Sequence, residues 1–417
     1  MRRALLLLLI ASCQRNPDHR EAPSSSGSAT PQVSTPAPVS TSSSSTTATP
    51  PAPSPTPPAV DRPPPPPLPD PLPGTRKDLT AAIGQSWRAA IGDFNGDGKN
   101  EIAVASSAEL KVIDANGTTI ATTPATDGIQ RLVAADLDGD GRAELYAGWG
   151  QTRDHMDTKA KVTVHRLDKG SLTAETVLAP ETTRQEVVAL VPMKDAKSLF
   201  IAYFDSKYMV TSTIAQKGAQ GWAASKVAQL RTATSYARGD VNGDGKPDIV
   251  VGRVYGDDKG VDGDAFVLAA DGTRTKIPST RGMRSIAVID ADGDGKPEVY
   301  MGDGWHQNYG QYAHGLLTRA KFAGGAFQTD LVEDTVGQYG IEEIVPATVD
   351  GKIVLLTAGS NYTRAFMRTG DHWSGLTIGP VARDIVAGDL DGKPGDEILL
   401  LGEKSEIVNL RGVVWPK

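Results

Sequence analysis

The stretch "DFNGDGKNEI", residues 93–102, sets acidic and amide side chains at alternate positions around two glycines, then runs into an apolar segment. Oxygen-bearing side chains fall at loop positions one, three, five and nine, with glycine at position six. This is the opening part of an EF-hand-like calcium loop, in which the backbone carbonyl of position seven is a further ligand. Oxygen ligands without cysteine or histidine suit Ca²⁺ better than zinc or copper. The stretch therefore predicts a calcium-binding turn beside a buried strand.

The same pattern returns as "DLDGDGRAEL" from Asp136, "DVNGDGKPDI" from Asp240 and "DADGDGKPEV" from Asp290. The alternative is a solvated acidic hairpin that uses aspartate and glycine only for turn geometry. We predict about four structural Ca²⁺ sites, with these side-chain ligands: Asp93, Asn95, Asp97 and Glu101; Asp136, Asp138, Asp140 and Glu144; Asp240, Asn242, Asp244 and Asp248; Asp290, Asp292, Asp294 and Glu298.

A fifth copy of the motif, "DLDGKPGDEI" from Asp389, has Lys393 at position five. The ammonium group of Lys393 would take the place of an ion and bridge Asp389, Asp391 and Glu397. We therefore predict no calcium in this loop.

The acidic motifs recur at regular intervals. Successive copies start 43, 104, 50 and 99 residues apart, so the second and fourth intervals are about double the other two. Residues 186–204 and 341–359 match the frame of the motif and its following strand but lack the carboxylates. Counting these two gives seven units with a mean period of about 49 residues, in the range of propeller blades. Seven such units fill the chain from about residue 75 onward.

Each unit has the pattern of four strands. A run with small side chains, such as "AAIG" (89–92), precedes the loop, and an apolar run such as "DIVVGR" (248–253) follows it. A variable loop and a hairpin with a Gly- or Asp-rich turn come next, and helical periodicity is absent. We predict an all-β fold, a seven-bladed β-propeller of four-stranded antiparallel blades. Residues 79–84 or 413–417 would supply the outer strand of the last blade.

The motif "DxNGDGKxD/E" followed by an "IVVG"-type strand, present in four of the seven units, resembles the FG-GAP/VCBS repeat family. This propeller repeat is also seen in integrin alpha heads and in some fungal and bacterial lectins, and the resemblance covers about residues 76–417. It implies Ca²⁺ in the turn between the first two strands of a blade, but not in the third and sixth units, which lack the motif. Because the family is functionally mixed, the resemblance bears on the fold more than on the activity.

The N-terminal part of the chain has the pattern of an exported lipoprotein. "MRRALLLLLIASC" combines arginines, a short apolar run and a lipobox-like ending, so Cys13 is the candidate lipidation site; an ordinary signal peptide is the alternative. We assign residues 1–12 to the signal peptide, 13–75 to the lipidated cysteine and a disordered Pro/Ser/Thr-rich linker, and 76–417 to the propeller. The expected location is the bacterial cell envelope, anchored by lipid, with the outer membrane favoured.

The overall charge restricts the partners. The net charge is −7 with a pI near 5.5, which argues against a general nucleic-acid binder. Cys13 is the only cysteine, so no disulfide forms within the chain.

Arginine and aromatic side chains gather in the loops expected on the face opposite the acidic turns. Four arginines precede the acidic motifs by five or six residues, and guanidinium groups suit anionic ligands; the alternative is that they pair with neighbours and close the centre of the ring. Aromatic rings in the loops after the second strands would stack on sugars. The candidate ligand-binding residues are Trp87, Arg88, Arg131, Arg284, Arg383, Trp149, Trp305, His306, Tyr309 and Tyr362.

Three functional classes follow from this pattern. The favoured one is an envelope-anchored, calcium-stabilised binding module that recognises a glycan or a protein on the face opposite the calcium loops. The alternatives are a polysaccharide-active enzyme, a lyase or hydrolase, and a structural subunit of an envelope complex. Neither "HExxH" nor "GxSxG" is present around the loop histidines, so we assign no catalytic residue.

Overall fold

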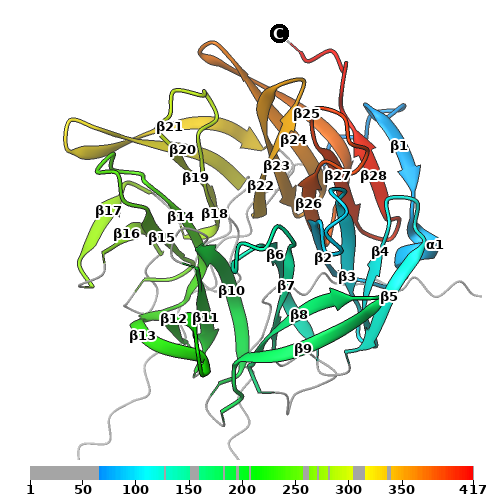
Figure 1. The fold of residues 1–417 in the computed structure, drawn as a ribbon. Coiled ribbons are helices and arrows are strands. Elements are labelled where there is room, and N and C mark those ends of the chain that lie inside the picture. The colour runs from blue at the N-terminus through cyan, green and yellow to red at the C-terminus, as the bar shows by residue number, and fades with distance from the viewer. Residues whose placement is uncertain are drawn as a thin grey trace, which may run out of the picture. The chain divides into compact units, whose positions relative to one another are not determined.

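The computed structural model describes residues 65–125, 128–150, 159–181, 184–193, 197–205, 208–256, 263–269, 272–279, 282–303, 315–335 and 340–416. They form seven four-stranded antiparallel sheets, which confirms the predicted seven-bladed β-propeller. The innermost strand of each sheet packs against that of the next, and the last packs against the first, so the ring closes. Figure 1 shows the innermost strands around the centre and the outermost strands at the periphery.

We number the sheets as blades 1 to 7 and give their strands from the axis outward. Blade 1 has β2 (Arg88–Gly92), β3 (Glu101–Ala105), β4 (Glu109–Ile113) and β5 (Thr119–Pro124). Blade 2 has β6 (Ile129–Ala135), β7 (Glu144–Trp149), β8 (Val162–Asp168) and β9 (Ser171–Leu178). Blade 3 has β10 (Glu186–Met193), β11 (Ser198–Phe204), β12 (Met209–Gly218) and β13 (Gly221–Arg231). Blade 4 has β14 (Ala233–Gly239), β15 (Asp248–Arg253), β16 (Ala265–Leu268) and β17 (Arg274–Ile277).

Blade 5 has β18 (Met283–Ile289), β19 (Glu298–Asp303), β20 (Gly315–Ala323) and β21 (Ala326–Thr335). Blade 6 has β22 (Ile341–Val349), β23 (Lys352–Gly359), β24 (Tyr362–Thr369) and β25 (His372–Pro380). Blade 7 has β26 (Asp384–Gly388), β27 (Glu397–Leu401), β28 (Glu406–Asn409) and, outermost, β1 (Thr75–Asp78). Blades 3 and 6 are the two units expected from the degenerate segments 186–204 and 341–359.

Blade 7 is built from both ends of the described chain. Its outer strand is β1, which pairs with β28 in the register Thr75 with Asn409. The prediction that residues 79–84 or 413–417 would supply this strand was wrong. Residues Thr80–Ile83 form the short helix α1, with Ile83 buried, and residues 413–416 have no strand. A helix of four residues is the only one among the described residues, and none there is long and apolar enough to cross a membrane.

The core lies between adjacent blades. Every residue of β3, β7 and β27 is buried, because the second strand of a blade has another blade against each face. Glycine at one register position lets the next blade approach. A Cβ on Gly148 would lie 2.6 Å from Cγ1 of Val187 in blade 3, and a Cβ on Gly252 would lie 2.8 Å from Cδ1 of Ile286 in blade 5.

Candidate functional site

The acidic loop of blade 1 joins β2 to β3 and has the backbone expected of a calcium loop. The N–H of Gly98 donates to Oδ2 of Asp93 at 2.8 Å, and the N–H of Gly96 donates to Oδ1 of the same residue at 2.7 Å. Gly96 and Gly98 have positive φ, 79° and 83° respectively, which glycine adopts without strain. These bonds wrap the loop around the first aspartate.

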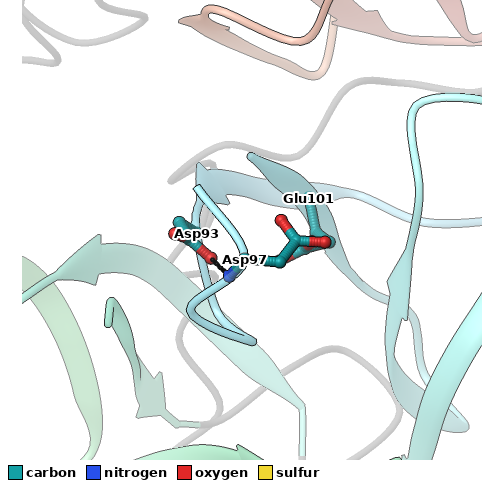
Figure 2. A group of neighbouring side chains, drawn as sticks. All are labelled: Asp93, Asp97 and Glu101. Atoms are coloured by element: carbon teal, nitrogen blue, oxygen red, sulfur yellow. Dashed lines mark hydrogen bonds between the residues drawn. The ribbon is translucent and has the colours of Figure 1, made fainter. Parts of the chain in front are cut away.

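Three carboxylates converge in this loop. Asp93, Asp97 and Glu101 each offer one oxygen atom, and the three atoms lie within 4.8 Å of one another. Figure 2 shows the two aspartates on the turn, with Glu101 facing them from the strand. Burial raises the pKa of Glu101, and the negative charges of Asp97 and Asp93 raise it further. Among the described residues, no lysine or arginine forms an ion pair with any of the three, so the charge of the loop is left without a partner.

The loop of blade 4 repeats this arrangement. The N–H of Gly245 donates to Oδ2 of Asp240 at 2.8 Å. Burial raises the pKa of Asp248, and Asp244 and Asp240 add to the effect. No basic side chain among the described residues pairs with these carboxylates. Asp240, Asp244 and Asp248 are not among the clusters whose oxygen atoms lie within 4.8 Å of one another, and Asp248 is shorter than the glutamate at position nine of the other loops.

The loops of blades 2 and 5 contain basic side chains. In blade 2, Arg166 on β8 donates to Glu144 at 2.6 Å and reaches Asp138 at 3.5 Å. In blade 5, Lys321 on β20 lies 2.7 Å from Asp292 and 2.8 Å from Glu298. Here the internal cations supply part of the positive charge that an ion would bring.

Arg368 of the adjacent blade 6 adds a second contact to the blade 5 loop, 2.6 Å from Asp292. Burial of Asp292 acts to raise its pKa, but Lys321 and Arg368 outweigh this effect and hold the pKa at about 2. Asp290, Asp292 and Asp294 form the cluster of this loop, and Glu298 is turned toward Lys321 instead.

The blade 7 loop is neutralised by a residue that the sequence did not indicate. Lys393 does contact Asp391, at 3.2 Å, but its side chain is 72% exposed. Arg411, which follows β28, lies 2.6 Å from Asp391 and also pairs with Glu397. Its guanidinium group holds the pKa of Asp391 at about 2. Arg411 therefore carries the bridging role expected of Lys393.

The four candidate arginines lie at two different levels of the ring. Arg88 and Arg131 stand five residues before their acidic loops and pair across the sheet with Ala105 and Gly148. Arg284 lies at a β-bulge one residue earlier in its strand, and its Nη1 is 2.7 Å from Glu342. Arg383 precedes β26, and its backbone N–H donates to Leu401. The four arginines therefore do not form the single ring that was expected. Two lie at one register position of the innermost strands, and the other two lie one residue earlier.

In each innermost strand, one residue lies at the same register position as Arg88 and Arg131. From blade 6 around to blade 2 these residues are charged, and on the other side of the ring they are small. In order from blade 1 they are Arg88, Arg131, Ala189, Ser235, Ser285, Glu343 and Asp384. We call them the axial ring. About five residues of extended chain, roughly 17 Å, separate it from the acidic loops.

Side chains of the axial ring bind the backbone of the next blade. Nε of Arg88 donates to the carbonyl of Gln130 at 2.7 Å, and Nε of Arg131 donates to that of Val188 at 2.8 Å. Oδ2 of Asp384 accepts from the N–H of Ala89 at 2.7 Å. These bonds tie successive blades together at the axis.

Glu343 and Asp384 are neighbouring carboxyl groups within this ring. Oε2 of Glu343 accepts from the N–H of Ile385 at 3.1 Å. Burial raises the pKa of Glu343 to about 8, and the charge of Asp384 acts in the same direction, against the opposite effect of Arg88 and Arg131. Burial also raises the pKa of Asp384. The pair therefore retains a proton near neutral pH.

The other candidate ligand residues have diverse surroundings. Trp149 is 5% exposed, and Lys161 lies 4.5 Å from the centre of its ring, so the ring offers little surface for stacking. Tyr362 is 6% exposed, and its hydroxyl donates to the carbonyl of Pro66. Trp87 is half-buried and donates to Ile129 at 2.8 Å. Trp305, His306, Tyr309 and the lipidation candidate Cys13 lie outside the described residues.

The basic residues in the loops of blades 2, 5 and 7 had no local signal in sequence. Arg166 lies 22 residues after Glu144, and Arg411 lies 14 residues after Glu397. They become recognisable only when the third strand is paired with the second, which places Arg166 beside Glu144 across the sheet.

Comparison with known proteins agrees with the repeat seen in the fold. Residues 93–147 and 240–301 match the model of the FG-GAP-like repeat, and they contain the acidic loops of blades 1 and 2 and of blades 4 and 5. A solved structure described as "Structure of Dos1 propeller" is similar over 82% of this chain and 95% of that chain, with a TM-score of 0.50 and 11% identity. At that identity the likeness shows the fold alone. No curated protein matches the sequence.

Proposed function

Since this chain is a seven-bladed β-propeller with FG-GAP-like repeats, we propose that it is a calcium-stabilised binding module anchored to the cell envelope. It recognises a glycan or protein ligand on the face that carries the axial ring, opposite the acidic loops. Propellers present loops and strand ends on a rigid scaffold, which suits recognition.

The observation that carries this proposal is the uneven charge of the axial ring. Arg88 and Arg131 form one half of the charged arc, and Glu343 and Asp384 form the other half. The remaining ring residues are small and uncharged. These side chains also bond the next blade, and a ligand with ionic and hydrogen-bonding groups would be oriented by their opposite charges.

Calcium is proposed to stabilise the opposite face. The oxygen donors of the blade 1 loop fit the ion best, because three carboxylates converge there without a basic partner. We propose the tightest binding in blades 1 and 4 and weaker binding in blades 2 and 5, where basic side chains compete. The ion would neutralise carboxylates that otherwise repel each other, and so hold the turn between the first two strands.

The lipid anchor at Cys13 is proposed from the sequence alone. Lipidation of Cys13 and a linker up to residue 75 would hold the propeller on the order of 100 Å from the membrane, because proline-rich chain extends about 3.1 Å per residue. Metabolic labelling with a fatty-acid analogue tests this step, and loss of the label in Cys13→Ser is the expected result. Equal labelling of that variant would contradict it.

A glycan and protein array probed with the propeller, with and without calcium, tests the binding function. Binding that is saturable and without turnover is expected. Arg131→Gln should weaken it, whereas Arg274→Gln, on the outermost strand of blade 4, is the matched control and should not. Melting curves confirm that each variant is folded. Equal binding by Arg131→Gln and the wild type would remove the axial ring from the ligand site.

One observation favours an enzyme as the second candidate. Glu343 and Asp384 are adjacent carboxyl groups with raised pKa values beside two guanidinium groups, a combination found in acid–base catalysis. A polysaccharide-active enzyme would release shortened or unsaturated sugars from an acidic polysaccharide, and Glu343→Gln would abolish the release. Binding without any product selects the binding module.

A further inference from the structure

A cavity of about 170 Å³ lies between blades 2 and 3, on the side of the acidic loops. It is remote from the axial ring. Tyr146 on β7 and Trp222 on β13 form its aromatic wall, and the rings are 6.2 Å apart at an angle of 86°. A dry engineered cavity of about 150 Å³ accepts one benzene-sized ring. The space between these blades is therefore large enough for one six-membered ring against an aromatic wall.

One basic side chain at the cavity has no carboxylate partner among the described residues. Three basic side chains line it, from Arg166, Lys197 and Lys217, against two carboxylates, from Asp138 and Glu144. Arg166 pairs with both of these carboxylates and with Glu175, and Lys217 also pairs with Glu175. Nζ of Lys197 donates to the backbone carbonyl of Asp138 at 3.3 Å, and no carboxylate among the described residues pairs with it. A negatively charged group on a ligand would give Lys197 a partner.

At the same position between blades 5 and 6, an arginine reaches the acidic loop. Trp373 lies opposite Arg368 across β24 and β25, as Trp222 lies opposite Lys217 across β12 and β13. Trp373 also meets Tyr300 edge-on, at 5.8 Å and 81°, in the way that Trp222 meets Tyr146. Arg368 extends into the acidic loop and contacts Asp292 at 2.6 Å.

Lys217 does not reach the acidic loop of its own site. Its Nζ pairs with Glu175 at the rim, at 2.9 Å, and leaves Asp138 to Arg166. In these two sites built on the same pattern, the cation opposite the tryptophan reaches the acidic loop in one and stands at the rim in the other.

We propose that the cavity between blades 2 and 3 is a subsite for a single uronic acid unit. The sugar ring lies against Trp222, its carboxylate meets Lys197, and its hydroxyl groups bond the carboxylate of Asp138. Sugar rings stack on aromatic side chains through their C–H faces, and ammonium groups bind carboxylates by charge-assisted hydrogen bonds. This proposal adds a second binding site to the function proposed above, on the opposite face of the ring.

Isothermal titration with glucuronate, its methyl ester and glucose tests the site on the full propeller. Glucuronate should bind, and the two neutral sugars should bind at least tenfold more weakly, because a hydrogen bond between charged groups is lost. Lys197→Gln should weaken glucuronate binding about tenfold. Lys352→Gln, which removes an exposed lysine at the start of β23 in blade 6, is the control and should bind as the wild type does. Trp222→Leu should abolish binding, and Trp373→Leu should not.

Absence of glucuronate binding at tens of millimolar, equal binding of glucose, or unchanged binding in Lys197→Gln would each overturn the proposal. Should Trp222→Leu fail to fold, Lys197→Gln decides alone, because that side chain is exposed. The two proposals fail separately. Array binding that is lost in Arg131→Gln but kept in Lys197→Gln supports the axial face and rejects this cavity.

Discussion

Nη2 of Arg166 lies 2.6 Å from Oε1 of Glu144, at the place in the blade 2 loop where the blade 1 loop has no basic residue. In blade 1 the equivalent carboxylate, Glu101, accepts instead from the amide of Asn95 at 2.6 Å. The difference follows the residue at loop position three. Loops with asparagine there have no internal cation among the described residues, and those with aspartate, in blades 2, 5 and 7, have at least one. The additional negative charge is therefore balanced within the chain.

Removal of this internal cation should make the stability of the propeller more dependent on calcium. In Arg166→Gln the carboxylates of Asp138 and Glu144 lose their basic partner. Because the arginine is partly exposed, the free energy of unfolding in chelator should fall by only about 1–2 kcal/mol. Added Ca²⁺ should restore most of the loss by taking the vacated position. Thermal melts in chelator and in calcium measure both effects. A similar midpoint shift for Arg166→Gln and wild type on adding calcium would contradict this role.

The ring should depend on the short N-terminal strand. Deletion of residues 1–78 removes β1, leaves the edge of β28 unpaired and takes Arg76 from the nearly buried carboxylate of Glu406. Glu406 keeps its ion pair with Lys404, so most of the cost comes from the unpaired edge of β28. Deletion of residues 1–64 keeps β1 and is the matched control. We expect a lower melting temperature and aggregation only for the longer deletion, measured by calorimetry and size-exclusion chromatography.

Glu343 should give the protein a pH-dependent stability. Its pKa of about 8 in the folded protein lies above the ordinary value of 4.5, so the folded state holds an extra proton between these values. This contribution is present below about pH 4.5 and is lost as the pH rises through 8. Glu343→Gln should therefore melt about 2–4 °C above the wild type at pH 9, with a smaller difference at pH 6.

The control for this pH dependence is Glu109→Gln, which changes a carboxyl group on β4 far from the axis. Its melting temperature should follow that of the wild type from pH 6 to pH 9. A difference between Glu343→Gln and wild type that stays constant with pH would show that the carboxyl group does not titrate in this range.

Close packing between blades should make the glycines of the second strands intolerant of a methyl group. In Gly148→Ala the new Cβ would lie 2.6 Å from Cγ1 and 2.9 Å from Cβ of Val187, a stiff side chain in the next blade. Overpacking of this kind costs about 1–3 kcal/mol. Gly218→Ala, whose Cβ would meet only a carbonyl oxygen at 3.7 Å, should be close to neutral. Chemical denaturation of both variants measures the difference, and equal midpoints would contradict it.

Much of the fold could be predicted from sequence, because each blade repeats a local pattern. The acidic turn, the small residues of the first strand and the apolar second strand lie within about 20 residues, so a period and a blade count follow. The closing strand could not be found in this way. "TRKD" (75–78) is short, polar and mostly exposed, and its pairing with β28 depends on the whole ring being formed.

The candidate sites were predictable to a smaller extent. The carboxylates of an acidic loop are neighbours in sequence, and in four loops they do converge. The basic residues that compete with an ion come from later strands or from the next blade, as Arg368 does for Asp292. The axial ring likewise combines seven separate strands, so the proximity of Glu343 and Asp384 has no signal in either segment alone.

The number and location of bound calcium ions show whether basic side chains decide which loops bind the ion. Isothermal titration of the propeller with CaCl₂ should show two tight sites per chain and weaker binding beyond them. The double variant Asp97→Asn and Asp244→Asn should lose the tight sites, whereas Asp391→Asn, in the loop occupied by Arg411, should keep them. Four equivalent sites, or tight binding unchanged in the double variant, would contradict the claim that basic side chains decide which loops bind calcium.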